Sequence, residues 1–258
     1  MEAGRLIRTA GLICLMSTAV HAEDGHYRWG MEAAGEGAPP YSLPTHHRRF
    51  DTGIAGEPVI PFTLDEDWSV IARTILPLSF QPEIVQGIRE ILRLGDFQEE
   101  LLLAPTRRRN FAWGAGGVLQ LPTATAAAFG AGKWAVGPAA FGSITGGPWV
   151  LGASTKSIRS FAGDSKRDDL NVTTFDPYVI YSFAQGWHLS CASHIAADWR
   201  ADGGSVWSVP IGAGIRRVFE LGTSSMNAEL TADHNAVTPP GRPGDWLFQI
   251  RVQLVFAR

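Results

Sequence analysis

The segment GDWLFQIRVQLVFAR, residues 244–258, alternates apolar and polar side chains along its length. Its apolar set takes every second position: Trp246, Phe248, Ile250, Val252, Leu254 and Phe256. A strict period of two indicates an extended strand with one apolar face and one largely polar face. A soluble protein buries the apolar face of such a strand, whereas a barrel in a membrane turns it toward the lipid. Other features of the chain indicate whether this apolar face points into a protein core or toward lipid.

The composition is that of a globular protein with a small net charge. The chain has 258 residues, 45% hydrophobic and 18% charged, a mixture that excludes intrinsic disorder. The formal net charge of -3 is too small for a basic binding surface, so no nucleic-acid partner is expected. The 29 glycines and 9 tryptophans favour an all-β architecture with close backbone contacts and aromatic bands.

The first 22 residues are typical of a secretory signal peptide. Arg5 and Arg8 precede an apolar core, residues 9–18, which is too short to span a bilayer. Val20 and Ala22 fit the small-residue pattern of a cleavage site, so cleavage is predicted after Ala22.

The cysteines exclude one class of secreted protein. Cys14 lies in the apolar core and would be lost on cleavage, which leaves Cys191 without an intramolecular partner. A small extracellular domain held by disulfides is therefore not expected. The chain after residue 22 contains no run of about 18 apolar residues, so a membrane-spanning form must be a closed β-barrel.

The alternating pattern recurs along the chain, and the links between the predicted strands differ in length. The strands are predicted at 41–50, 57–64, 68–78, 94–105, 111–122, 134–144, 148–162, 170–184, 187–200, 206–221, 225–238 and 244–257. Tight turns are predicted at 65–67, 106–110, 145–147, 185–186 and 223–225, and longer links at 79–93, 123–133 and 163–169. The link 79–93 spaces its apolar residues at helical intervals, so a short surface helix is also predicted there. Outer-membrane barrels have this asymmetry, with short periplasmic turns and longer outer loops.

Most tryptophans lie at the ends of the predicted strands, where a barrel carries its aromatic girdles. The predicted girdle residues are Trp68, Trp134, Trp149, Trp187, Trp199, Trp207, Trp246 and Phe256. The sequence therefore predicts an all-β fold, an antiparallel transmembrane β-barrel of about 12 strands. Residues 1–22 are the signal peptide, 23–40 a flexible leader and 41–258 the barrel. The strand at 41–50 is the weakest because His46, His47, Arg48 and Arg49 make both of its faces polar.

Several segments resemble one family of bacterial outer-membrane proteins. They are EPVIPFTLDEDWSVIARTILPL (57–78), WGAGGVLQLPTATAAAFGAGKWAVGPAA (113–140), GPWVLGASTKSIRSFAGD (147–164) and the C-terminal segment 244–258. Members of this family are usually labelled "transporter" or, misleadingly, "neuromedin U", and the family is similar to outer-membrane proteins of phenol meta-pathway clusters. The resemblance covers about residues 50–258 and implies a Gram-negative outer-membrane barrel with a transport role. It supplies no catalytic or ligand residues. The polar start HHRRFDTGIAGEP (46–58) departs from the family pattern and leaves closure of the barrel open.

Two groups of residues invite a catalytic or metal-binding interpretation, and strand geometry opposes both. His188, His194 and Asp198 share one face, but at ~3.3 Å per residue the two histidines lie about 20 Å apart. Zinc ligands must all lie near one ion, so neither a metal site nor a cofactor is predicted. Ser190 stands two residues, about 6.6 Å, from His188, and no GxSxG motif accompanies it. No catalytic residue is therefore assigned, and the protein is predicted not to be an enzyme.

The polar faces of the strands supply candidate residues for the barrel interior. They are Lys156, His188, His194, Asp198, Arg216, Glu229, Asp233 and Arg251. Both signs of charge are present, which predicts internal ion pairs or a weakly selective passage. Twelve strands lie between the filled barrels of about eight and the open channels of 16–18.

Three functions are compatible with the sequence. The first is an outer-membrane channel or transporter for a small solute, a class that includes partly apolar and aromatic solutes. The second is an outer-membrane enzyme that acts on lipid, and the third a secreted, soluble β-sandwich that binds a ligand. The first predicts the Gram-negative outer membrane as the location. Its partners would be the membrane lipid, the solute and the barrel-assembly machinery, for which the terminal LVF (residues 254–256) resembles a recognition signal.

Overall fold

The computed structural model describes residues 13–23, 26–30, 52–56, 59–81, 91–106, 110–201, 206–221, 224–237 and 246–256. In these residues the chain forms sixteen strands and two short 3-10 turns, η1 (Ala127–Phe129) and η2 (Ala184–Gly186). The strands are β1 (Ile13–Glu23), β2 (His26–Gly30), β3 (Thr52–Gly56), β4 (Val59–Thr63), β5 (Trp68–Gln81), β6 (Ile91–Leu94), β7 (Phe97–Pro105), β8 (Phe111–Leu121), β9 (Lys133–Gly146), β10 (Trp149–Gly163), β11 (Asn171–Ser182), β12 (Trp187–Ala192), β13 (Ile195–Asp198), β14 (Trp207–Leu221), β15 (Ser224–Val237) and β16 (Trp246–Phe256). Within the same residues, no helix has the length and hydropathy needed to cross a membrane.

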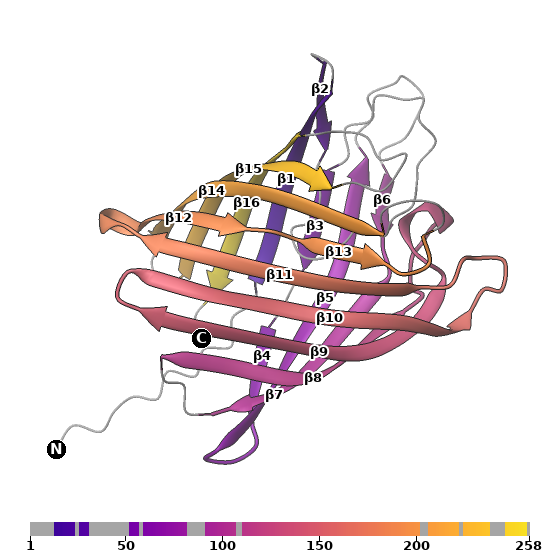
Figure 1. Cartoon of the computed structure of the whole chain (residues 1–258), viewed down its shortest axis with the longest axis horizontal. Helices are drawn as coiled ribbons and strands as arrows, with labels where there is room; N and C mark the ends of the chain where they lie inside the picture. Colours follow the sequence, from indigo (N-terminus) through magenta and orange to yellow (C-terminus); the bar gives the residue numbers. More distant parts are fainter. Residues whose placement is uncertain are drawn as a thin grey trace.

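All strand pairings are antiparallel, and they close into a ring (Figure 1). From β5 the order runs through β7, β8, β9, β10 and β11, then through β12 and β13 to β14, β15, β16, β1 and β3, and back to β5. The sixteen described strands fill twelve positions, because β2, β3 and β4 share one position, β6 and β7 a second, and β12 and β13 a third. A closed ring leaves no unpaired edge, and the predicted barrel of about 12 strands is confirmed.

The strand that completes the ring is not the predicted one. The sequence predicts 41–50 for the position next to β16, but those residues lie outside the described part of the chain. The structure instead pairs β1 with β16 from Ile13↔Val255 to Ala22↔Trp246, and with β3 on its other side. The apolar segment 13–22 lacks the proline and the four consecutive polar residues, two of them arginines, of 41–50, so it suits a ladder position better. This strand falls within the predicted signal peptide.

The connections alternate in length as predicted. Tight links follow β4, β9, β11 and β14, and the link between β9 and β10 is only Gly147–Pro148. Two tight turns need left-handed backbone, with Gly147 at φ 55° and Gln185 at φ 62° next to Gly186 at φ 74°. Long links follow β8, β10, β13 and β15. We call the two ends of the barrel the short-turn end and the long-loop end. The predicted surface helix lies largely outside the described residues, and Ile91–Leu94 within that link is strand.

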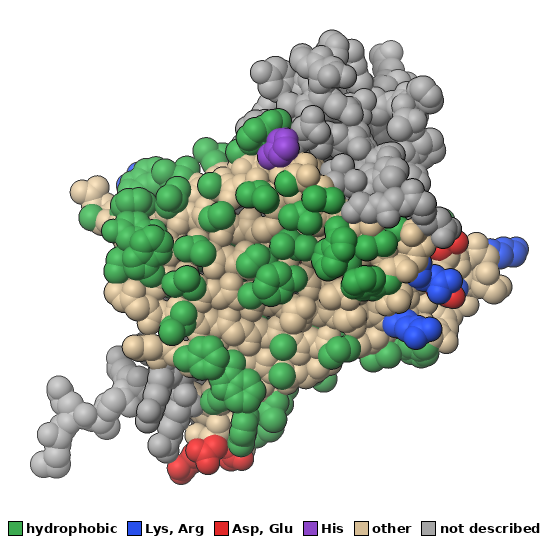
Figure 2. All heavy atoms as spheres, viewed as in Figure 1, with side chains coloured by type: hydrophobic (Ala, Val, Ile, Leu, Met, Phe, Trp, Pro, Cys, Tyr) green, Lys and Arg blue, Asp and Glu red, His purple; other side chains and the backbone are tan. Residues whose placement is uncertain are grey.

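Burial alternates along the strands and defines an inner and an outer face. On β7, Glu100, Leu102 and Ala104 are buried, whereas Leu101 and Leu103 are 53% and 42% exposed. Hydrophobic side chains are spread over the visible outer surface, and charged ones gather near its edges (Figure 2). A soluble β-sandwich would bury its apolar faces between two sheets. The single ring with an apolar outside therefore shows that the sandwich alternative is wrong.

The pairing of the C-terminal strand β16 with β15 shows which of its faces points outward. Ile250 pairs with Leu230, which is 54% exposed, and Arg251 pairs with Glu229, which is 4% exposed. Directly paired residues share a face of the sheet. The apolar positions of β16 therefore belong to the outer face, and its polar positions to the inner face.

Candidate functional site

The inner face of the barrel has two unlike halves. The apolar half lies on β5 and β7–β10 and consists of Ile71, Leu102, Ala104, Val118, Ala135, Ala139 and Ile158. All seven are at most 7% exposed, so these side chains are shielded from solvent. The polar half lies on β11, β12 and β13–β15 and contains Asp176, His188, His194, Arg216, Thr231 and Asp233. These six residues are all partly exposed.

A polar network crosses the apolar half. Lys156 Nζ lies 3.5 Å from Glu100 Oε1, and Arg73 NH1 lies 3.5 Å from Glu100 Oε2. Lys156 also donates to Gln98, whose Nε2 donates to Gln120 Oε1 at 2.9 Å. We call these five residues the Lys156 network. The side chains of Lys156 and Glu100 are each 5% exposed, so each charge depends on its partner for compensation.

The reach of Lys156 depends on the curvature of the wall. β10 and β7 are three strand spacings apart, about 14 Å on a flat sheet, which is too far for the two side chains to bridge. The closed ring curves, and inner-face glycines allow neighbouring backbones to approach closely. A Cβ at Gly137 would lie 1.5 Å from Ser157 O, and one at Gly116 would lie 1.9 Å from Leu101 O. Only glycine fits at these two positions.

The polar half carries two further groups of contacts. His194 Nδ1 bonds directly to Asp176 Oδ1 across β13 and β11, and Ser154 donates to the other oxygen of Asp176. Nearer the short-turn end, Glu229 accepts from Ser190 through Oε1 and from Arg216 NH2 at 2.9 Å through Oε2. The side chain of Glu229 is 4% exposed and that of Arg216 is 25% exposed.

The predicted interior residues fall at inner-face positions but do not form one site. Arg216 and Glu229 are in contact, and Arg251 is paired with Glu229 in register, although its side chain lies outside those described. His188 bonds to Ser182, 3.0 Å away, and Asp198 accepts from the backbone N–H of Arg200. Asp233 lies over Gly212, where a Cβ would meet its carboxylate at 2.0 Å. Lys156 belongs to the opposite half.

The catalytic and metal-binding interpretations find no support in these contacts. Ser190 donates to Glu229 and to Gly214 O, not to a histidine. No group of three or more metal-ligating side chains comes together in the described part of the chain.

Sequence reasoning missed three charged residues that form ion pairs in the interior. Glu100, Arg73 and Asp176 were not among the predicted interior residues, yet each makes an ion pair there. Their signal was present, because the period of two along FQEELLLAP (97–105) places Glu100 on one face with Gln98 and Leu102.

Aromatic side chains gather on the outer face at both ends of the barrel. At the short-turn end Trp68 packs edge-on against Trp113 with ring centroids 6.1 Å apart, and Trp149 packs against Tyr181 at 4.6 Å. Trp187 lies there under the Arg217 guanidinium.

At the long-loop end Trp199 packs against Trp207 at 5.6 Å, and Trp246 packs against His234. Trp134 begins β9 at the same end. The predicted girdle tryptophans thus fall into two bands; Trp113 and Tyr181 were missed, and the side chain of Phe256 lies outside those described.

The links at the long-loop end are held by buried and charged contacts. Asp96 accepts from the backbone N–H groups of Ala124 and Ala131, which fixes the link around η1. Arg167 donates to the carbonyls of Ala127 and Gly130 in the same link. Lys133 Nζ lies 2.9 Å from Asp169 Oδ1, and its hydrogen bond and charge lower the pKa of the Asp169 carboxyl below 3.8.

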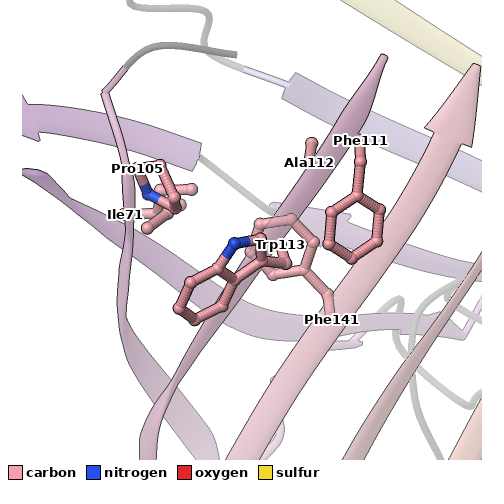
Figure 3. Close-up of a pocket in the computed structure, with 7 residues that line it drawn as sticks. Ile71, Pro105, Phe111, Ala112, Trp113 and Phe141 are labelled. Carbon is pink, nitrogen blue, oxygen red and sulfur yellow. The ribbon is translucent and has the colours of Figure 1, made fainter. Parts of the chain in front are cut away.

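A small cavity lies in the wall at the short-turn end. Its volume is about 10 Å³, room for at most one water. Ile71, Phe111, Trp113 and Phe141 are among the residues that surround it (Figure 3). Its apolar lining and size exclude it as a solute-binding site.

The structure is similar to solved outer-membrane barrels. An outer-membrane channel from Pseudomonas putida F1 matches with a TM-score of 0.61 and 13% sequence identity, over 99% of this chain and 100% of that chain. The NanC porin matches with a TM-score of 0.52 and 11% identity, over 94% of this chain and 98% of that chain. No protein-family model matches the chain, and no curated protein does. At these identities the likeness shows the fold: the chain is built as an outer-membrane β-barrel.

Proposed function

We propose that this protein is an outer-membrane channel that passes a small solute. One observation carries the proposal: large apolar side chains face outward between the two aromatic bands, while ionic groups face inward. Ile215 and Leu230 are 46% and 54% exposed at mid-strand, and Val136 near the start of β9 is 50% exposed. A continuous apolar belt of this kind is rare on soluble proteins and matches the hydrocarbon region of a bilayer.

The proposed location is the outer membrane of a Gram-negative bacterium, with lipid and the barrel-assembly machinery as partners. The family suggested by the sequence resemblance is part of the proposal. Solved channels with this fold support it, and one similar structure is itself described as an outer-membrane channel.

The solute would pass along the ionic residues of the interior, with Asp176 added to the predicted set. Paired charges of both signs, such as Arg216 with Glu229, favour a weakly selective passage over a strong cation or anion filter. The contacts of Ser190 give no reason to prefer a lipid-acting enzyme.

Conductance across a planar lipid bilayer tests the proposal. The purified, folded protein should produce discrete conductance steps, whereas a heat-denatured sample of the same preparation should not. A folded preparation that gives no steps and no solute flux, yet hydrolyses phospholipid, would replace the channel with the enzyme.

Signal-peptide cleavage after Ala22 belongs to the same proposal and has a structural consequence. Cleavage would remove Ile13–Ala22, almost all of β1, and so expose the edges of β16 and β3. Unpaired backbone groups in lipid cost several kcal/mol each, so another segment would have to take that position. The intact mass of the membrane-inserted form decides the point. A mass that includes residues 13–22 would show that the cleavage prediction is wrong.

A further inference from the structure

Arg217 places a cation on the outer face at the short-turn end of the barrel. It lies on β14 and pairs in register with Trp187, the first residue of β12. Residues two apart along a strand share a face, and Ile215, two residues before Arg217, is 46% exposed on the outer face. The Arg217 side chain is itself exposed. The guanidinium therefore belongs to the aromatic band at this end and not to the interior.

Two aromatic rings fix the position of this cation. The Cζ atom of Arg217 lies 5.0 Å from the centroid of the Trp187 ring and 5.0 Å from that of the Phe219 ring. Trp187 belongs to the neighbouring strand, and Phe219 lies two residues further along β14. Each ring attracts a guanidinium through its face. Aromatic rings carry no net charge, so they orient the cation without neutralising it.

Apolar side chains surround Arg217 on the outer face. Its pairing partner on β15 is Ala228. The adjoining row toward mid-barrel consists of Leu189, Ile215 and Leu230, which pair with one another and are 48%, 46% and 54% exposed. In the part of the chain that the structure describes, Arg217 forms no ion pair with a carboxylate. A cation in surroundings of low polarity needs a compensating charge, so an anion from outside the protein is expected beside it.

The depth of Arg217 indicates which anion reaches it. The residue lies beside the start of β12, directly after the tight turn at η2, and tight turns of outer-membrane barrels face the periplasm. Aromatic bands lie at the level of the lipid headgroups. The phosphates of the periplasmic leaflet are therefore the anions at the height of the guanidinium. Arginine binds a phosphate through two parallel N–H donors, and the small side chain of Ala228 leaves room for one on the side toward β15.

We propose that Arg217, held between Trp187 and Phe219, binds the phosphate of an anionic phospholipid on its open side over Ala228. The acyl chains of this lipid lie along the apolar row that includes Ile215. A zwitterionic headgroup carries a cation beside its own phosphate, so an anionic headgroup compensates the Arg217 charge better. The inference rests on the membrane location in the proposed function, but it goes beyond solute passage and requires no open lumen.

Lipid retention by the purified protein tests the site. The full chain, folded in a non-ionic detergent, is mixed with equal amounts of phosphatidylglycerol and phosphatidylcholine, and bound lipid is counted by native mass spectrometry. Wild type should retain phosphatidylglycerol about fivefold over phosphatidylcholine, as one cation beside an anionic headgroup predicts. Arg217→Gln should lose most of that preference. Lys166→Gln, which removes an exposed cation from a long loop, is the matched control and should keep it. Equal preference in wild type and folded Arg217→Gln would overturn the proposal.

A second comparison tests the position of the phosphate. Ala228→Leu fills the space beside the guanidinium without removing its charge and should lower the retention of phosphatidylglycerol toward that of Arg217→Gln. Ala232→Leu makes the same change on the same face of β15, away from Arg217, and should retain the lipid as wild type does. Heat-modifiable gel mobility confirms that each variant is folded. Full retention in folded Ala228→Leu would overturn the placement of the phosphate over Ala228.

Two further measurements separate this site from a soluble anion and from the channel. Millimolar inorganic phosphate, added at constant ionic strength, should not displace phosphatidylglycerol, because it gains nothing from the apolar row. Displacement would overturn the lipid assignment in favour of a free anion. Conductance of wild type is measured on the same preparation. A lipid preference without conductance would mean that the channel function fails and the lipid site stands, and conductance without a lipid preference would mean the reverse.

Discussion

Lys156 on β10 and Glu100 on β7 are three strands apart in the sheet, yet their charged atoms lie 3.5 Å apart and both side chains are 5% exposed. The curvature of the closed ring brings the two side chains within reach of each other. Between them, Gly116 on β8 and Gly137 on β9 allow the neighbouring backbones to approach closely.

Removing one partner of this pair should destabilise the barrel more than removing both. Glu100→Leu leaves the Lys156 charge buried without its main compensation, a change that typically costs about 3–5 kcal/mol. The double variant Glu100→Leu with Lys156→Met should recover most of that loss. Urea-induced unfolding in lipid vesicles, followed by tryptophan fluorescence, measures the free energies. Lys166→Met, an exposed cation in a long loop, is the control with an expected change near zero. Additive losses in the double variant would show that the two residues do not interact.

The close approach of β9 and β10 should depend on Gly137. Gly137→Ala places a Cβ 1.5 Å from the backbone oxygen of Ser157, so β9 and β10 must separate or the variant must fail to assemble. Overpacking of this kind costs at least about 1–3 kcal/mol, and more when backbone is the obstacle. Gly146→Ala is the matched control on the same strand, because no atom lies within 4 Å of its added Cβ. The assay is the heat-modifiable folded fraction. Equal folded fractions for both variants would show that the close approach at Gly137 is not required.

An arginine should destabilise the barrel more on the outer face of β15 than on the inner face of the same strand. Leu230→Arg introduces a cation on the outer face at mid-strand of β15, where Leu230 is 54% exposed, and should cost about 2–4 kcal/mol in the membrane. Thr231→Arg adds the same group one residue later on the inner face and should cost much less. Unfolding free energies in vesicles of a single lipid make the comparison. A larger loss for Thr231→Arg would mean that the two faces have been assigned the wrong way round.

The alternation of apolar and polar residues with a period of two predicted most of this fold. It did so because a strand of the barrel turns one face to lipid and the other to the interior. This alternation correctly located β16 and the inward-facing polar residues of β14 and β15, since these strands have one clearly apolar face. The alternation did not predict the first strand. The segment 13–22 has the composition of a signal peptide, and the sequence pattern alone cannot distinguish a signal peptide from a strand there. The Lys156 network could not be predicted, because a contact across three strands depends on curvature. Close backbone contacts occur at Gly116 and Gly137, and glycine in a strand signals such contacts without indicating their partner.

Cys191 provides a probe for the membrane-facing surface. It lies on β12 between exposed Leu189 and the strand end, and its thiol is free and exposed on the outer face. In vesicles a lipid-soluble maleimide should label it, and a charged maleimide should not. In the unfolded protein both reagents should label it, which serves as the positive control. Rapid labelling of the vesicle-embedded protein by the charged reagent would contradict a lipid-facing position for this strand.

The contact between Lys133 and Asp169 should stabilise the long-loop end in a pH-dependent way. Lys133 lowers the pKa of the Asp169 carboxyl below its ordinary 3.8, so the folded state favours the ionised form. The stabilisation is therefore complete above about pH 4 and is lost as the pH falls through the lowered pKa of the folded state. The thermal unfolding midpoint of wild type minus that of Asp169→Asn should be constant from neutral pH to about pH 4 and should shrink toward zero in stronger acid.

Asp168→Asn controls for charge alone in that experiment, since it removes a neighbouring carboxylate while the contact of Lys133 with Asp169 is kept. Its midpoint should stay closer to wild type at neutral pH than that of Asp169→Asn. A difference between wild type and Asp169→Asn that grows as the solution is acidified would have the wrong sign for a lowered pKa. That result would exclude the Lys133 contact as a source of stability at this end of the barrel.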